Sequence, residues 1–396
     1  MRYFLQILCS IFTVFAFDLS GQRTLPRCGS ISPQIENLNH TIDPASYPRE
    51  EIVIPIVFHV IAQNELQDIP DEVLESQIDI LNEDYNGQNN DIDQTPDRFR
   101  GFVGNAGIRF CLAKTAPNGN TTNGIIRKST TIDFIGSQRF QDGRRAIKHD
   151  ELGGSSAWDP QRYLNVWIGD RNDFIGDATF PVDETVMPEE DGIVLKFNAV
   201  GRNGLDDSFN LGRTLTHEIG HYLNLLHLHG SQTGCNNAGD LVDDTPRQEG
   251  PYFGCDDIGQ SSCGSDDMDT NFMQFRNDAC LQYFTKGQVA RMIDALFTYR
   301  LDLINSGICN TTSVVPPHPL RVAQIQTMSE GVRINLNVLN EQNYGLELFD
   351  MSGRRVWSTR ENASHRYEIS GATLTGIYIL VLDFENSLFS RKILIP

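Results

Sequence analysis

The sequence LTHEIGHYLNLLH occupies residues 215–227 and places three histidines around one glutamate. His217 and His221 are four residues apart, so on a helix they project from one face, one turn apart, and both can bind one metal ion. Two histidines leave a tetrahedral zinc site short of a ligand, and His227 can supply it if the chain turns sharply after the helix. The stretch therefore predicts a zinc centre with His217, His221 and His227 as ligands.

Two further residues of this stretch have a predicted role. Glu218 lies one position round the helix from His217, where its carboxylate reaches a water on the metal rather than the metal itself, as a general base requires. Asn224 permits the sharp turn, because asparagine readily adopts the left-handed conformation that ends helices. The alternative is an amphipathic core helix with histidines present by accident, and each further ligand at the right offset weakens it.

The segment resembles the metzincin zinc-binding pattern, with Asn224 where that clan usually has glycine. Four downstream segments narrow the resemblance to the pappalysin family of metalloproteases: DLVDDTP (240–246), NFMQF (271–275), AC (279–280) and FTKGQ (284–288). The resemblance implies a fold of the α+β class, namely a metzincin-like zincin domain with a mixed sheet, an active-site helix and an irregular, disulfide-bonded lower half. It also implies that Met273 forms the turn beneath the zinc site, a packing role that suits a core methionine equally well.

Two departures from the family pattern limit what the resemblance carries over. Family members usually have a tyrosine, thought to steady the transition state, where this chain has Phe275. A contribution from that hydroxyl is therefore absent or comes from elsewhere. Members that prefer arginine on the primed side of the cut have an aspartate immediately before the last cysteine, where this chain has Ala279 with Asp278 adjacent. Arginine specificity is therefore not transferred.

The chain is strongly acidic, with a formal net charge of -20 over 396 residues. This charge argues against a nucleic-acid or anionic-membrane partner. Many of the acidic residues follow the histidines, and dense carboxylates and carbonyls are also how proteins hold calcium. The resemblance implies a calcium site around Asp240 and Thr245. A solvated acidic surface is the alternative, and the sequence leaves both open.

The N-terminal 50 residues resemble export and latency segments. Residues 1–20 are predicted to be a signal peptide, because Arg2 precedes an apolar run that is too short to span a membrane. Residues 21–50 are predicted to be a pro-segment. Within it, the run PRCG (26–29) resembles the cysteine switch of metzincin proenzymes, in which the Cys28 thiolate would bind zinc and exclude water. A structural cysteine paired elsewhere remains the alternative.

Loss of the signal peptide removes Cys9 and leaves seven cysteines, an odd number. Export would permit disulfides among them. The family resemblance pairs Cys235 with Cys263 and Cys255 with Cys280, although four cysteines allow three connectivities. Cys111 with Cys309 is the remaining pair.

Residues 51–310 form the predicted metalloprotease domain. Hydrophobic periodicity predicts strands at 52–60, 107–113, 163–168, 175–181 and 192–197, and helices at 71–85 and from 285 to about 305. The strand at 175–181 would border the cleft and bind an extended substrate through backbone hydrogen bonds. His59 is predicted to be a buried or rim histidine rather than a metal ligand.

A proline-rich linker (311–319) precedes residues 320–396, where apolar residues alternate with polar ones. This pattern predicts a small antiparallel β-sandwich of six or seven strands. The region resembles the sorting domain of the type IX secretion system, and that resemblance implies recognition by secretion machinery. A sandwich that binds carbohydrate or protein is the alternative.

Together these features predict a secreted or cell-surface zinc endopeptidase that acts on protein or peptide substrates. A zinc-bound water would attack the peptide bond, with Glu218 as general base. The rival is a surface adhesion or binding protein with an inactive protease-like scaffold, and Phe275 is its main support. A zincin with a distant glutamate as third ligand is disfavoured, because His227 already fills that position.

Overall fold

The computed structural model describes residues 25–30, 52–181, 187–203, 205–304 and 306–309, and seven C-terminal strands between residues 323 and 395. The predicted signal peptide and linker, and most of the predicted pro-segment, lie outside the described residues.

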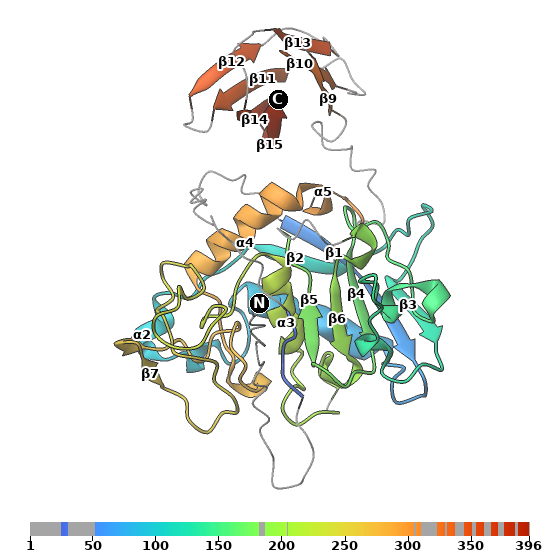
Figure 1. Ribbon diagram of the computed structural model, residues 1–396, viewed down its shortest axis with the longest axis vertical. Coiled ribbons are helices and arrows are strands. Elements are labelled where there is room, and N and C mark those ends of the chain that lie inside the picture. Colours follow the sequence, from blue (N-terminus) through green and yellow to red (C-terminus); the bar gives the residue numbers. More distant parts are fainter. Residues whose placement is uncertain are drawn as a thin grey trace, which may run out of the picture.

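A six-stranded mixed sheet forms one half of the N-terminal domain (Figure 1). Its strands are β1 (Ile52–Ala62), β2 (Ile108–Leu112), β3 (Ile125–Ser129), β4 (Leu164–Gly169), β5 (Gly176–Ala178) and β6 (Ile193–Lys196). The order is β2-β1-β4-β6-β5, and the long β1 pairs in parallel with β2 along its first half and with β3 along its second. The short β5 runs antiparallel to β6 and forms one edge.

The strand predicted at 52–60 is present as β1, and it is an inner strand of the sheet. Its residues from Ile54 to Ile61 are all buried, because both faces of the sheet are covered. His59 is buried within this strand, and its two ring nitrogens lie 2.8 Å from Ser155 Oγ and 3.0 Å from Asn165 Oδ1. Both nitrogens are therefore used in hydrogen bonds, and the prediction of a buried histidine is confirmed.

The long helices follow the predicted boundaries closely at their N-termini. They are α1 (Asp71–Tyr85), α3 (Arg213–Tyr222) and α4 (Lys286–Tyr299), with the single turns α2 (Asp97–Arg100) and α5 (Leu301–Ile304). Helix α4 begins with a capping box, in which Thr285 Oγ1 accepts from Gln288 N and Gln288 Oε1 accepts from Thr285 N.

The prediction of one continuous helix to about residue 305 is wrong at Arg300. The backbone leaves the helical conformation there, with φ at -128°. The Arg300 side chain turns back to donate to the Tyr222 carbonyl at 3.1 Å and to both carboxylate oxygens of Asp191 at 2.7 and 3.1 Å. These contacts come from segments far away in the sequence, so the local periodicity of the helix did not reveal them.

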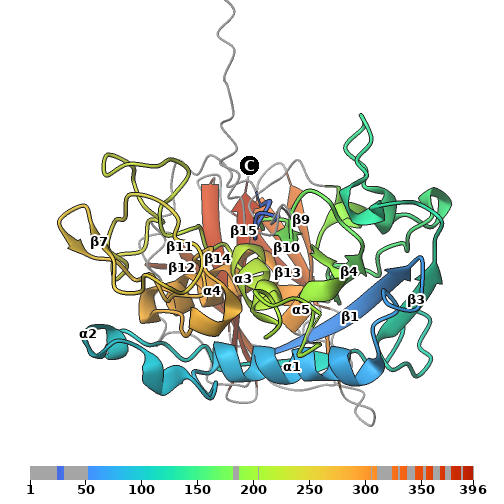
Figure 2. The ribbon, with the colours of Figure 1, turned by 90° about the horizontal axis from the view of Figure 1, so that it is seen from below.

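Helices α1 and α3 lie against each other through buried polar contacts (Figure 2). Tyr85 OH donates to the Thr216 carbonyl at 3.0 Å, and Thr216 Oγ1 donates to Asp84 Oδ2 at 2.7 Å. Burial raises the pKa of Asp84 to about 7. These two hydrogen bonds fix helix α3 against α1.

The lower half behind α3 is largely irregular, as predicted. Two disulfides bond this part of the chain, Cys235–Cys263 and Cys255–Cys280, and they are the pairs that the resemblance implied. The remaining predicted pair, Cys111–Cys309, is also present and joins strand β2 to the segment after α5. The fully buried Arg276 side chain adds a polar centre, because it donates to the carboxylates of Asp257 and Asp269.

The C-terminal region is all-β, as predicted. Two antiparallel sheets have the orders β13-β10-β9 and β12-β11-β14-β15. Their strands are β9 (Ala323–Met328), β10 (Gly331–Leu336), β11 (Tyr344–Asp350), β12 (Arg355–Thr359), β13 (Arg366–Ser370), β14 (Gly376–Phe384) and β15 (Ser387–Ile395). Alternate side chains of β11 and β14 are buried, among them Leu346, Leu348 and Leu380.

Candidate metal centre

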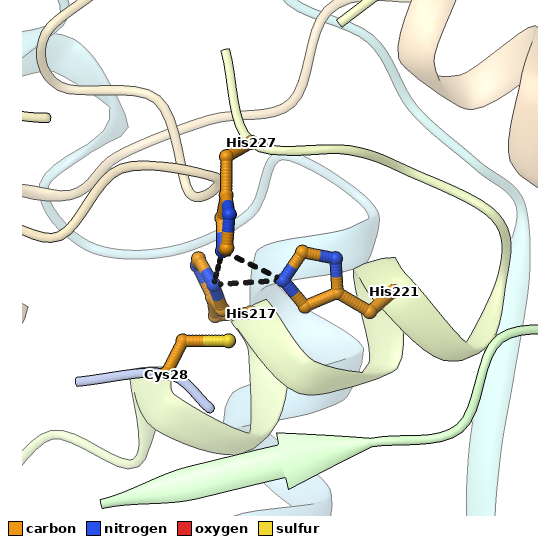
Figure 3. Close-up of side chains that lie close together, drawn as sticks. All are labelled: Cys28, His217, His221 and His227. Carbon is orange, nitrogen blue, oxygen red and sulfur yellow. Dashed lines mark hydrogen bonds between the residues drawn. The ribbon is translucent and has the colours of Figure 1, made fainter. Parts of the chain in front are cut away.

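Helix α3 presents His217 and His221 on one face and ends at Tyr222 (Figure 3). Asn224 then adopts a left-handed conformation with φ at 73°, and Leu225 N donates to the Gly220 carbonyl at 2.8 Å. This is the predicted turn, and it directs the chain so that His227 returns to the two helical histidines.

The three histidines meet through their Nε2 atoms. These atoms are 3.2 Å apart between His217 and His221, 3.3 Å between His217 and His227, and 2.9 Å between His221 and His227. All three side chains are buried. Zinc–nitrogen bonds of about 2.0–2.1 Å in a tetrahedral site would separate the ligand nitrogens by about 3.3 Å.

The opposite ring nitrogens show which protonation state the helical histidines adopt. His217 Nδ1 lies 2.7 Å from the Phe272 carbonyl, and His221 Nδ1 lies 2.7 Å from the Leu225 carbonyl. A carbonyl oxygen only accepts, so each Nδ1 donates a proton and each Nε2 offers a lone pair. Lone pairs that face one another at this distance are stabilised by a cation between them, and the residues therefore fit a metal ion.

Burial also keeps these rings neutral. It lowers the pKa of His221 to about 4. The pKa values of His217 and His227 lie well below the ordinary value. Burial is the main cause, and the repulsion that a protonated His221 would exert on a second charged ring adds to it. Neutral imidazole is the form that binds a metal, so the three rings are in their ligand form at neutral pH.

Glu218 is fully buried next to the histidines. Burial, together with the charge of Asp177, raises the pKa of Glu218 to about 8. Its Oε2 atom accepts a hydrogen bond from Ser30 Oγ at 2.9 Å, whereas its Oε1 atom is buried without a hydrogen-bond partner in the described part of the chain. A cation at the three nitrogens would favour the ionised carboxylate, which is the form that accepts a proton.

Cys28 completes the cluster from the predicted pro-segment (Figure 3). Its sulfur and the three ligand nitrogens all lie within 4.8 Å of one another, and Cys28 alone among the described cysteines is outside a disulfide. Burial and Glu218 raise the pKa of the thiol well above its usual value. The sulfur therefore ionises readily only where a cation compensates its charge.

The chain around Cys28 forms a parallel bridge with the edge strand β5. Ile175 N donates to the Pro26 carbonyl, Gly176 N donates to the Arg27 carbonyl, and Gly29 N donates to the Gly176 carbonyl, at 2.9 to 3.0 Å. The backbone groups on this edge of β5 are therefore taken by residues 26–29. The strand predicted at 175–181 is shorter than expected but does form the edge.

Met273 lies beneath helix α3, as the resemblance implied for the turn methionine. It is fully buried, and a Cβ at Gly220 would come within 2.5 Å of its sulfur. Because Gly220 has no side chain, the Met273 side chain has room to pack against the helix at this position. The same loop supplies the Phe272 carbonyl that orients His217.

Phe275 lies beside the histidines, and it lacks the hydroxyl group of the tyrosine that is usual at this position. Its ring centroid is 4.5 Å from that of His227, in an edge-to-face arrangement. His229 stacks on the His227 ring, with centroids 5.3 Å apart, and also lies edge-to-face with Phe275 at 5.6 Å. The position of His229 was not predicted from the sequence, because a histidine two residues after a predicted ligand had no expected role.

The buried anchor of residues 25–30 was also not predicted from the sequence. Arg27 is buried, and it donates to Asp278 Oδ1 at 2.9 Å and to the Arg276 carbonyl at 2.7 Å. Asp278 Oδ2 accepts from Leu211 N and Arg213 N at the start of α3. The only sequence signal was the position of Arg27 next to Cys28.

Asp240 and Thr245 do come together, away from the histidines. Thr245 Oγ1 donates to Asp240 Oδ1 at 2.6 Å, whereas the buried Asp240 Oδ2 has no hydrogen-bond partner within the described segments. Burial raises the pKa of Asp240 to about 7. Arg291 donates to the carbonyls of Asp240 and Leu241. One unpartnered carboxylate oxygen is thus available to a cation here.

Comparison with known families agrees with this site. A family model for peptidase family M43, described as pregnancy-associated plasma protein-A, matches residues 148–297, a segment that contains the three histidines, Glu218 and Met273. An extracellular metalloprotease of Arthroderma benhamiae is 30% identical over 250 residues, which cover 61% of this chain and 71% of the relative. One from Verticillium alfalfae is 31% identical over 262 residues, which cover 64% and 78%.

Solved structures of the metalloprotease mirolysin are also similar to this chain. A promirolysin variant from Tannerella forsythia is similar with a TM-score of 0.61 and 38% identity, over 66% of this chain and 88% of that one. Mature mirolysin from the same organism, in complex with a cleaved peptide, gives a TM-score of 0.60 and 38% identity, over 66% and 100%. The α+β fold expected from the sequence is confirmed.

Proposed function

Since this chain belongs to the pappalysin family of metalloproteases, peptidase family M43, we propose that it hydrolyses peptide bonds with zinc at His217, His221 and His227 and with Glu218 as general base. The observation that supports this most directly is the convergence of the three Nε2 atoms beside a buried carboxylate. Protein and peptide chains are the proposed substrates.

Zinc, Glu218 and strand β5 each have a separate role in the proposed reaction. Zinc, when bound, polarises the scissile carbonyl and lowers the pKa of water at its open position towards about 7. Glu218 accepts a proton from the attacking water and returns it to the leaving nitrogen. The backbone of β5 binds the substrate as an added strand, once residues 26–29 have left it.

Replacing Glu218 by glutamine tests this role. The variant E218Q keeps the shape of the side chain but cannot accept a proton, so we expect kcat to fall by about 10²- to 10⁴-fold. Zinc content should stay at the wild-type value, because Glu218 is not a ligand. Peptide-cleavage kinetics and metal analysis measure kcat and zinc content in the converted enzyme, that is, the enzyme after removal of its predicted pro-segment. Comparable turnover in E218Q would remove Glu218 from the mechanism, and a zinc-free wild-type protein would contradict the proposed centre.

We also propose that Cys28 keeps the enzyme latent by binding the metal. In this arrangement its sulfur excludes water from the open zinc position. The support is the position of the sulfur, within 4.8 Å of the ligand nitrogens, and its lack of a disulfide.

The variant C28A should therefore be prematurely active. We expect the intact chain to cleave a short peptide at least about tenfold faster than the wild-type chain, and its activation lag to shorten, because a metal–thiolate bond is lost. The control is the fully converted enzyme, which lacks residue 28 and should show the same kcat/KM from both chains. An unchanged lag would count against the switch.

We further propose a calcium site at Asp240 and Thr245. Its support is the buried Asp240 Oδ2 atom, which has no hydrogen-bond partner in the described residues. Because burial raises the pKa of Asp240 to about 7, ionising it in the folded state costs free energy. In the calcium-free protein this group stabilises the fold below about pH 4, and the contribution is lost as the pH rises through 7. Calcium would compensate the ionised carboxylate.

Calcium should therefore raise Tm more at pH 8 than at pH 5, where protons compete for Asp240. At a calcium concentration a hundred times its Kd, we expect Tm to rise by about 5 °C or more at pH 8. Thermal unfolding of the zinc-loaded protein measures this rise. The matched variant D240N removes the charge and keeps the size, and its Tm should not respond to calcium. Equal Tm values with and without calcium in the wild type would exclude the site.

Finally, we propose that the chain is exported, with residues 1–20 as a cleaved signal peptide and residues 320–396 as a sorting domain read by secretion machinery. The relatives are named extracellular metalloproteases. No helix among the described residues is long and apolar enough to cross a membrane.

Deleting residues 320–396 should then leave the protein inside the cell, and the full-length chain should appear at the surface or in the medium without residues 1–20. Fractionation with N-terminal sequencing in the producing organism measures both. Undiminished secretion of the deletion variant would show that the C-terminal strands have another role.

A further inference from the structure

Cys28 and Ser30 project from the same face of the extended pro-segment, because side chains two residues apart in a strand share a face. The residue between them faces away. Gly29 lies against Phe174, and a Cβ there would come within 2.4 Å of the Phe174 ring. The order Cys-Gly-Ser therefore places two polar side chains beside Glu218, while the glycine between them leaves room for the Phe174 ring on the other side.

Ser30 makes two hydrogen bonds that do not involve the metal ligands. Its Oγ atom donates to Glu218 Oε2 at 2.9 Å and accepts from Ala178 N, on the edge strand β5, at 2.8 Å. The Ala178 carbonyl lies further away, at 3.4 Å. Since the hydroxyl has a single proton, the shorter contact with a carboxylate is the one that takes it. Ser30 thus links the proposed general base to the edge of the cleft.

We propose that Ser30 is a second latch of the latent enzyme, which occupies the carboxylate of Glu218 and the amide of Ala178 while Cys28 occupies the metal. The inference rests on the proposed function, since it takes Glu218 as the base. Ser30 Oγ fills the position from which a water molecule would give its proton to Glu218. Both the metal and the base are then blocked by one short strand.

We describe latency as an equilibrium between a closed state, in which residues 25–30 lie on β5, and an open state, in which they have left it. Two contacts that exist only in the closed state shift this equilibrium further than one. Each contact that only the closed strand makes lowers the open fraction by its own factor. A hydrogen bond to a buried charged group contributes about 1.5–3 kcal/mol, which corresponds to about a 10- to 100-fold change in that fraction. Glu218 Oε1 already lacks a partner among the described residues, so loss of Ser30 leaves the carboxylate without its nearest donor.

The labelling rate of Cys28 by a thiol reagent, in the zinc-loaded full chain, reports opening without any need for activity. The other cysteines of the described segments are disulfide-bonded. We expect S30A to label about tenfold faster or more than the wild type. The control S261A removes a similar serine–carboxylate bond, Ser261 Oγ to Asp266 at 2.8 Å, on the hairpin β7–β8 (Ser261–Ser262 and Ser265–Asp266), and should label at the wild-type rate.

A double-mutant cycle shows whether Ser30 acts through Glu218. In an E218A background the serine has lost its carboxylate partner, so the further change S30A should alter the labelling rate by less than about threefold. A full tenfold effect in that background would mean that Ser30 only holds the strand to β5, and would overturn the proposal.

A second measurement does not depend on how the variants fold. Synthetic peptides with the sequences LPRCGS and LPRCGA, which correspond to residues 25–30, are tested as inhibitors of the converted enzyme. We expect the serine peptide to inhibit about tenfold more tightly. Equal inhibition together with equal labelling of S30A and wild type would refute the latch. If the converted enzyme proves inactive, the proposed function fails, while the labelling cycle still decides the role of Ser30.

Discussion

Three imidazole Nε2 atoms are held within 3.3 Å of one another, and the rest of the fold supplies the groups that keep them there. Such an arrangement is unfavourable without a cation, so it persists only where the surrounding structure dictates it. Two carbonyls do this directly, Phe272 for His217 and Leu225 for His221. The first belongs to the irregular lower half and the second to the turn after α3. The metal centre is therefore a property of both halves of the domain, and not of the histidine helix alone.

Residues 25–30 are held beside the histidines by three chemically different side chains. Arg27 forms a buried ion pair with Asp278, Cys28 lies at the ligand nitrogens, and Ser30 binds Glu218. Removing one partner of a buried ion pair normally destabilises a protein strongly. Here Asp278 retains two backbone donors at the start of α3, Leu211 N and Arg213 N, so its charge remains compensated when Arg27 leaves. Departure of residues 25–30, as the proposed latency requires, would thus leave no isolated buried charge at Asp278.

Features with a short-range signal were predictable from the sequence, and long-range pairings were not. Ligand spacing, the left-handed Asn224, the capping box at Thr285 and the buried β1 all follow from local rules. Strand β3 was missed because most of its residues are polar and exposed. The end of α4 at Arg300 depends on Asp191, 109 residues earlier, and the contact of Ser30 with Glu218 spans 188 residues. The family resemblance supplied the disulfide pairs, which spacing alone left open among three connectivities.

The irregular half also has to be rigid, because it carries the Phe272 carbonyl and Met273. Few regular elements are available to hold it, so covalent links and buried charge take their place. Arg276 is fully buried with its guanidinium bound to Asp257 and Asp269, and Cys255–Cys280 closes the same region. Breaking the buried Arg276–Asp269 pair by removing one partner would cost about 3–5 kcal/mol. Since Asp269 and Phe272 are three residues apart, that rigidity is transmitted along the chain to the carbonyl that orients His217.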